Sequence, residues 1–147
     1  MPPSLVPELY VSDFDHSLEF YTAVLDFRIG YARRKEKFAY LEREDAALMI
    51  EQPIGRIWLA GPLEEPYGRG VNLQIGVTSV DTLHQAVQAA GVVILQSLEQ
   101  RDYRRATDIV TVRQFVIADP DGYLLRFSEM IEVRPIERNA DTTGETV

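Results

Sequence analysis

The sequence predicts an α+β fold built from two β-α-β-β-β modules, and two observations carry that prediction. A corner from strand to helix, Val11-Ser12-Asp13-Phe14-Asp15, recurs in the second half of the chain as Val77-Thr78-Ser79-Val80-Asp81. Each corner is followed by three short segments that read as strands, so the order of elements repeats as well. We expect a single domain, residues 1–131, whose modules form a curved, mostly antiparallel eight-stranded sheet. This sheet would make a cup with the helices on its outer face.

Module one is expected to span about residues 4–52. Val6–Val11 has the composition of a strand, and Ser12 or Asp13 then caps a helix whose apolar residues recur every three or four positions. Three further strands, separated by charged turns, are predicted at Phe27–Ala32, Phe38–Glu42 and Ala46–Glu51.

Module two, about residues 71–131, follows an irregular linking loop, residues 52–70, that holds three Pro and four Gly. A loop of that length inside a compact domain is typical of a functional or interface segment. The module repeats the pattern with a strand, a helix capped by Ser79 and ended by Gly91, and three strands. These strands are predicted at Val71–Val77, Val92–Leu95, within Ile109–Ala118, and at Tyr123–Ser128, the last two joined by the turn Asp119-Pro120-Asp121-Gly122. Residues 132–147 read as a polar tail.

Composition narrows the classes of function. The 147 residues include 15 Lys+Arg and 23 Asp+Glu, a net charge of −8, which argues against nucleic-acid binding and favours a cationic ligand. The absence of Cys excludes disulfides, thiolate metal sites and thiol nucleophiles. No membrane span is expected, because the longest apolar run, Ala46–Ile50, is far shorter than the roughly 18 residues required. With no secretory signal visible, a cytoplasmic location is expected.

Strand alternation predicts which side chains face away from the helices. The set is mixed in polarity: Glu8, Tyr10, Met49, Glu51, Asn72, Gln74 and Arg126. If this face is concave, it forms a polar pocket; the alternative is an antiparallel sheet with one solvated face, which shows the same alternation. Arg126 would then either pair with Glu8 or Glu51 or bind an anionic group of a ligand, because an unpaired buried guanidinium is costly.

The first-helix segment Leu9–Tyr21 and the turn Asp119–Tyr123 resemble the vicinal-oxygen-chelate superfamily, and the resemblance covers about residues 5–129. That superfamily includes glyoxalase I, extradiol dioxygenases, fosfomycin-resistance enzymes and bleomycin-resistance proteins. The resemblance implies metal-ligand positions at Val6, Met49, Asn72 and Arg126. None of these four is a usual metal ligand, so we expect no metal and no other cofactor. The two histidines, His16 and His84, fall on the predicted helices.

Within the superfamily the sequence is most similar to the metal-free bleomycin-resistance proteins. Val6-Pro7 resembles the Val-Pro around which those proteins exchange an N-terminal arm, which implies a homodimer with Pro7 at the exchange point. The resemblance also makes Phe38 a ligand contact, with Tyr40 and Trp58 as further candidate stacking surface. It implies non-catalytic binding and sequestration of a bleomycin-type glycopeptide antibiotic, which is cationic, or of a similar small molecule.

Two other functions remain open at this point. The first is a glyoxalase-like or dioxygenase-like enzyme acting on an unknown small molecule. It would need a metal at a displaced position, or Glu8, Glu51 or Tyr10 as acid or base. The second is a structural or regulatory dimer whose cup has no ligand.

Overall fold

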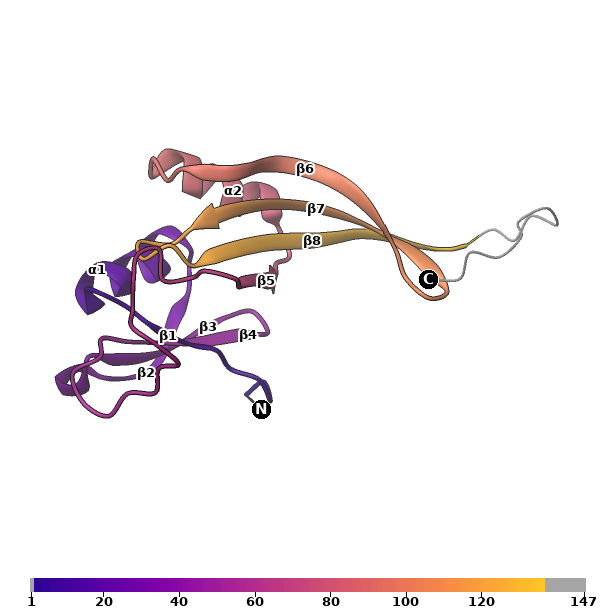
Figure 1. The fold of residues 1–147 in the computed structure, drawn as a ribbon. Coiled ribbons are helices and arrows are strands. Elements are labelled where there is room, and N and C mark those ends of the chain that lie inside the picture. The colour runs from indigo at the N-terminus through magenta and orange to yellow at the C-terminus, as the bar shows by residue number, and fades with distance from the viewer. Residues whose placement is uncertain (1, 137–147) are drawn as a thin grey trace.

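The computed structural model describes residues 2–136, which fold as two β-α-β-β-β modules (Figure 1). Module one contains β1 (Glu8–Tyr10), α1 (Phe14–Glu19), β2 (Arg28–Arg33), β3 (Phe38–Arg43) and β4 (Ala46–Glu51). Module two contains β5 (Asn72–Gly76), α2 (Val80–Ala89), β6 (Ile94–Arg104), β7 (Asp108–Ala118) and β8 (Leu124–Pro135). The predicted α+β class and the repeated order of elements are therefore confirmed.

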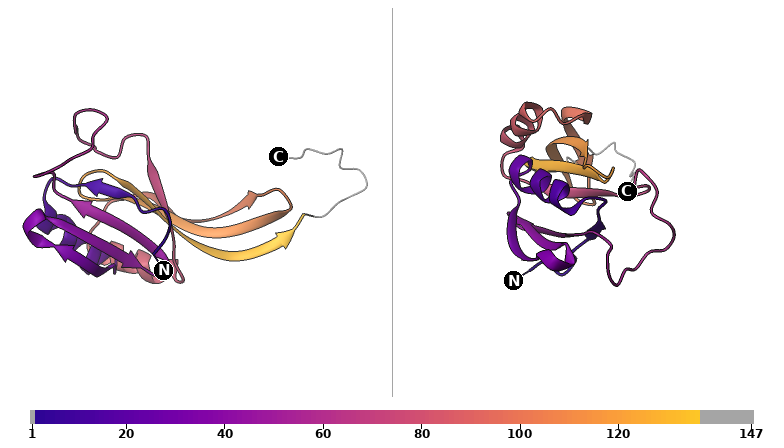
Figure 2. Two further views of the ribbon diagram at one scale, coloured as in Figure 1. Left: turned by 90° about the horizontal axis from the view of Figure 1, so that it is seen from below. Right: turned by 90° about the vertical axis from the view of Figure 1, so that its left-hand side faces the viewer.

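The strands form two separate four-stranded sheets (Figure 2). The first sheet has the order β1-β4-β3-β2 and the second has the order β5-β8-β7-β6. In each sheet the first strand of the module runs parallel to the last one, and the remaining pairs are antiparallel. The expected cup thus consists of two half-sheets, with no ladder joining them among residues 2–136.

Both helices begin at side-chain caps. Asp13 caps α1 by accepting a hydrogen bond from the His16 amide at 3.1 Å, which settles the choice between Ser12 and Asp13. Ser79 caps α2 by accepting from the Thr82 amide at 3.4 Å, as predicted. The first helix continues beyond α1 as a π-helical turn, Phe20–Val24, where the Thr22 hydroxyl donates to the Leu18 carbonyl. None of the described helices is long and apolar enough to span a membrane.

One hydrophobic core is shared by the two modules. The helices and the inner faces of both sheets contribute its fully buried side chains, among them Val11, Tyr21, Ile50, Val87 and Phe127. Each sheet therefore has one face in this core and one facing away from the helices. The second face is the one on which the candidate site residues were predicted.

The turn between β7 and β8 joins the modules and holds the linking loop. Gly122 adopts φ +87°, where a side chain would be strained, and a Cβ at this position would also collide with Pro66 of the loop. The Tyr67 amide donates to the Asp121 carbonyl at 2.8 Å, and the Asp121 carboxylate accepts from the Ser12 amide at 3.1 Å. The predicted turn thus also fixes the start of α1.

Three long strands extend from the body as an arm, defined here as residues 100–112 and 129–136 (Figure 1). The short strand predicted at Val92–Leu95 is wrong in extent, because β6 spans Ile94–Arg104. Residues 132–135, expected in the polar tail, belong instead to β8, because they pair with β7 out to Pro135. The remaining tail positions, 137–147, lie outside the described residues.

Candidate functional site

The residues predicted to share one cup are distributed over the two sheets. Glu8 and Tyr10 of β1 lie opposite Met49 and Glu51 of β4 in the first sheet. Gln74 of β5 lies opposite Arg126 of β8, and Asn72 lies opposite Leu124, in the second sheet. The structure therefore has two candidate regions, which we call the module-one face and the module-two pocket.

The module-one face is packed with its own aromatic side chains. Phe38, Tyr40 and Ala47 are buried there and contact Val6 and Met49. The Phe38 ring is only 3% exposed, and the Arg33 guanidinium lies 4.0 Å from its centre. In this arrangement the Phe38 ring has no free face for a ligand, since cation–π contact and packing already occupy it.

The Tyr40 ring is also covered by a neighbouring side chain. The exposed Tyr31 ring stacks on the Tyr40 ring with 5.0 Å between centroids. The Tyr40 hydroxyl is buried and has no hydrogen-bond partner among residues 2–136. The N-terminal segment runs along this face, where the Pro7 carbonyl accepts a hydrogen bond from the Met49 amide at 2.8 Å. The exchange of this segment between subunits stays a prediction.

Two carboxyl groups meet on the module-one face. Burial first, then a hydrogen bond with Glu8 and repulsion from its charge, together raise the pKa of Glu51 to about 7. The positive charge of Arg33 opposes this shift. Glu51 is therefore a carboxyl group that gains or loses a proton near neutral pH, which is the property that an acid or base in catalysis needs.

Tyr10 and Trp58 form the edge of this region. The Tyr10 hydroxyl accepts a hydrogen bond from the Trp58 backbone amide at 2.9 Å, which attaches the linking loop to β1. The Trp58 side chain is 67% exposed, and the Arg56 guanidinium covers one side of its ring at 4.7 Å from the centroid. Of the predicted stacking residues, Trp58 is the one whose ring is open to solvent.

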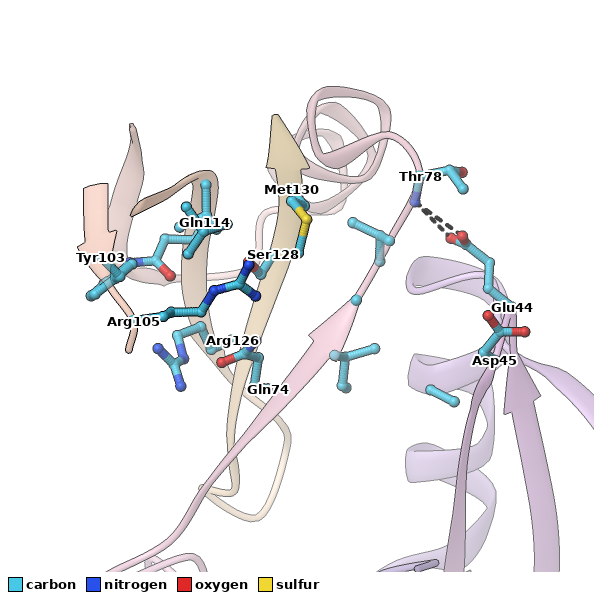
Figure 3. Close-up of a pocket in the computed structure, with 16 residues that line it drawn as sticks. Glu44, Asp45, Gln74, Thr78, Tyr103, Arg105, Gln114, Arg126, Ser128 and Met130 are labelled. Carbon is cyan, nitrogen blue, oxygen red and sulfur yellow. Dashed lines mark hydrogen bonds between the residues drawn. The ribbon is translucent and has the colours of Figure 1, made fainter. Parts of the chain in front are cut away.

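The module-two pocket is a cavity of about 670 Å³ between the second sheet, the arm and the β3–β4 turn (Figure 3). Two predicted site residues, Gln74 and Arg126, line it. The other polar side chains that line it are Glu44, Asp45, Thr78, Tyr103, Arg105, Gln114 and Ser128. Asn72 lies outside, beside Leu95 and Leu124 in a separate shallow hollow.

Most polar groups of this pocket already have partners. The Gln114 amide donates to the Glu99 carboxylate at 3.0 Å and to the Tyr103 hydroxyl at 2.6 Å. Arg105 forms a two-point ion pair with Asp108. Arg126 differs, because it has no hydrogen bond or ion pair with any residue that the structure describes, and its Nε is buried. The expected pairing with Glu8 or Glu51 does not occur, since those carboxylates belong to the other sheet.

Among the lining residues that the sequence did not predict, Gln114 lies on β7, Tyr103 on β6 and Arg105 in the turn between these strands. The alternation Val110, Val112, Gln114 in β7 already places an amide on an otherwise apolar face, and this signal was available in the sequence. Tyr103 and Arg105 had no such signal, because residues 96–104 are mostly polar and show no alternation.

The residues at the metal positions implied by the resemblance do not fit a metal ion. Val6 and Met49 pack on the module-one face, whereas Asn72 and Arg126 lie on the second sheet, and a guanidinium repels a cation. Within residues 2–136, no three His, Cys, Asp or Glu side chains come together in a way that could hold a metal. His84 lies on α2, and its ring packs edge-on against Phe115 at 5.1 Å between centroids.

Comparison with known proteins gives one family. A model described as the Glyoxalase/Bleomycin resistance protein/Dioxygenase superfamily matches residues 5–127. A solved structure of a member of that superfamily from Vibrio splendidus is 38% identical, with 86% of this chain and 97% of that chain covered and a TM-score of 0.41. Among curated proteins, none matches.

Two further solved structures are similar in fold at lower identity. A virulence protein from Salmonella typhimurium is 20% identical, covers 89% of this chain and 99% of its own, and has a TM-score of 0.65. TioX from Micromonospora sp. is 21% identical, covers 88% and 100%, and also has a TM-score of 0.65. At these identities the likeness concerns the fold alone.

Proposed function

We propose that this chain, which belongs to the glyoxalase/bleomycin resistance protein/dioxygenase superfamily, binds and sequesters a small organic molecule without transforming it. The observation that carries the proposal is the module-two pocket, a cavity of about 670 Å³ that combines apolar walls with a few polar groups. The residues at the family's metal positions, Val6, Met49, Asn72 and Arg126, favour binding over metal chemistry.

As the specific ligand we propose a bleomycin-type glycopeptide antibiotic or a similar molecule. A net charge of −8 and the Glu8–Glu51 carboxyl pair favour a ligand with cationic groups, and the exposed Trp58 ring offers a stacking surface. Phe38 contributes in this proposal only if Val6 and the rest of the N-terminal segment move off the module-one face.

We also propose that the chain works as a homodimer. The arm carries large apolar side chains that its own chain leaves exposed, including Met130 (59%) and Val133 (46%). Burial of such side chains against a second copy would remove apolar surface from water, which is the usual driving force of association.

The proposed antibiotic ligand is tested by isothermal titration. The chelator-treated protein is titrated with metal-free bleomycin at low and at moderate salt. We expect a dissociation constant at or below about one micromolar, worth roughly 8 kcal/mol. Affinity should fall as salt rises, because screening weakens attraction between the acidic protein and a cationic ligand. No detectable heat at either salt concentration would remove the antibiotic as a ligand.

An enzyme of the same superfamily is the second candidate, favoured by the pKa of Glu51 near 7. Its test is turnover of the hemithioacetal of methylglyoxal and of catechol by the wild type and by Glu51→Gln. A rate lost in Glu51→Gln while bleomycin binding persists would support catalysis. Metal analysis after mild purification completes the test, because a stoichiometric transition metal would contradict our interpretation of Val6, Met49, Asn72 and Arg126.

A further inference from the structure

Taking as given only the proposed binding of a small organic molecule, and not the cationic antibiotic, we infer that the module-two pocket selects an organic anion, whose carboxylate or equivalent group binds the Arg126 guanidinium. The ligand class is an apolar, preferably aromatic, body that carries one anionic group. Four features of the pocket lead to this class, namely the state of Arg126, the distribution of charge, the apolar walls and the open side of β5.

The guanidinium of Arg126 is a donor group without an acceptor. It lies near the start of β8, between Gln74 on β5 and Val116 on β7, and its Nε is buried with no partner among the described residues. A buried polar group without a partner destabilises the folded chain, and more so when it is charged. A carboxylate matches the fork of guanidinium donors and would remove this cost.

Two carboxylates that contact lining residues of the pocket already have partners. Glu99 accepts from Gln114, and Asp108 is paired with Arg105, whose guanidinium reaches the same pocket from the arm (Figure 3). The remaining acidic side chains of the lining, Glu44 and Asp45, lie across the pocket on the β3–β4 turn. The end around Arg126 therefore has positive charge that no carboxylate of the described chain neutralises.

The apolar residues that line the pocket favour an organic ligand over a small inorganic ion. Val110 and Val112 of β7 and Met130 of β8 line the cavity on the arm side. Tyr103 lies opposite Val110 across β6 and β7 and adds an aromatic edge. Apolar walls around one charged anchor are the usual composition of a site for an amphiphilic small molecule.

On the side of β5, the pocket has space for the apolar part of such a ligand. A Cβ placed on Gly76 would meet no atom within 4 Å, so the strand presents open volume there. Gln74, which is exposed on the same strand two residues earlier, can donate or accept a hydrogen bond at the edge of the anion. Positive charge, apolar surface and open volume thus occur together in one cavity.

Two fluorescent dyes that differ only in charge test the inference: anilinonaphthalene sulfonate and phenylnaphthylamine, which has the same rings without the sulfonate. We expect the wild type to bind the sulfonate dye at least about tenfold more tightly than the neutral dye. Arg126→Gln should weaken binding of the sulfonate dye by about tenfold or more and leave binding of the neutral dye within about twofold. Arg126→Lys, which keeps the charge without the fork, should lie between.

The matched control is Arg28→Gln, which removes the same charge from an exposed arginine on β2 that pairs with Glu42. It should leave both dyes unaffected. An equal loss in Arg28→Gln would mean that overall charge, not Arg126, attracts the anion, and would overturn the inference. The inference would also be overturned if Arg126→Gln lost affinity equally for both dyes, or lost affinity for neither.

A displacement experiment on the unaltered protein keeps the test independent of how the variants fold. Naphthoate should displace the bound sulfonate dye at about a tenfold lower concentration than naphthalene methanol, its neutral counterpart. Equal displacement would overturn the inference. If the protein binds bleomycin but Arg126→Gln leaves binding of both dyes unchanged, only the proposed anion site is refuted. If Arg126→Gln weakens binding of the sulfonate dye but the protein does not bind bleomycin, only the proposed antibiotic ligand is refuted.

Discussion

Glu51 is partly buried and lies beside a second carboxyl group, Glu8, and both features make the stability of the fold depend on pH. The pKa of its carboxyl is raised from 4.5 to about 7, by burial first and by Glu8 second. Below about pH 4.5 the folded and unfolded chains both hold this proton, and well above pH 7 neither does. Between these values only the folded chain holds it, so the free energy of unfolding falls as pH rises. Because Glu51 is partly exposed, we expect a loss of only about 1 kcal/mol.

Glu51→Gln should remove this contribution, since glutamine stays neutral at every pH. Urea unfolding at pH 5 and pH 8 measures it: the variant should be more stable than the wild type at pH 8 and similar at pH 5. Glu19→Gln, at an exposed position of α1, is the control and should follow the wild type at both values. A Glu51→Gln variant that lost as much stability between pH 5 and pH 8 as the wild type would contradict the assignment.

At the scale of elements, a buried hydrogen bond between two side chains links the first helix to the β7–β8 turn. The Tyr21 hydroxyl donates to the Asp119 carboxylate at 2.7 Å. Burial and the negative charge of Asp119 raise the pKa of Tyr21 well above its ordinary value, so the hydroxyl keeps its proton and remains a donor. Burial likewise raises the pKa of Asp119, which also accepts from the amides of Asp121 and Tyr123.

Tyr21→Phe keeps the ring in the core and removes only this donor. We expect the free energy of unfolding to fall by about 1–3 kcal/mol, because the buried carboxylate loses a hydrogen bond. Tyr67→Phe is the matched control: its ring packs against Tyr123, but its hydroxyl has no hydrogen-bond partner among residues 2–136. Thermal and urea unfolding measure both variants. Equal losses would mean that the Tyr21 hydroxyl contributes no more than a surface hydroxyl.

The elements also show where the sequence was informative. Alternation located β3, β4, β5 and the start of β8 closely, but not the end of β8, and the repeated corner located both helix caps. It missed the length of β6, because residues 96–104 are polar on both faces in an arm that has solvent on either side. Alternation predicts on which face of its own sheet a side chain lies, but it does not predict which other sheet that face meets. It therefore put Glu51 and Arg126 in one cup, although the two residues lie on different sheets.

At the scale of the whole molecule, the arm extends from the body (Figure 2), and its register gives it one apolar and one polar face. Tyr103, Val110 and Val133 lie opposite one another across its three strands and share one face. The other face is polar, since Asp102 accepts from Thr111 at 2.6 Å and from Arg134 at 2.9 Å. An apolar face on a protruding ribbon is unfavourable in water, and the proposed dimer would cover it.

Val133→Glu tests this by placing a charge in the middle of the apolar face. Sedimentation should show a dimer for the wild type, and the variant should dissociate at a concentration at least about tenfold higher, because the interface would bury an unpaired carboxylate. Gln100→Glu adds the same charge to the opposite face of the arm, since Gln100 alternates with Tyr103 and Arg101 along β6. That control should dimerise like the wild type. A monomeric wild type, or equal weakening by both substitutions, would show that the apolar face does not hold two copies together.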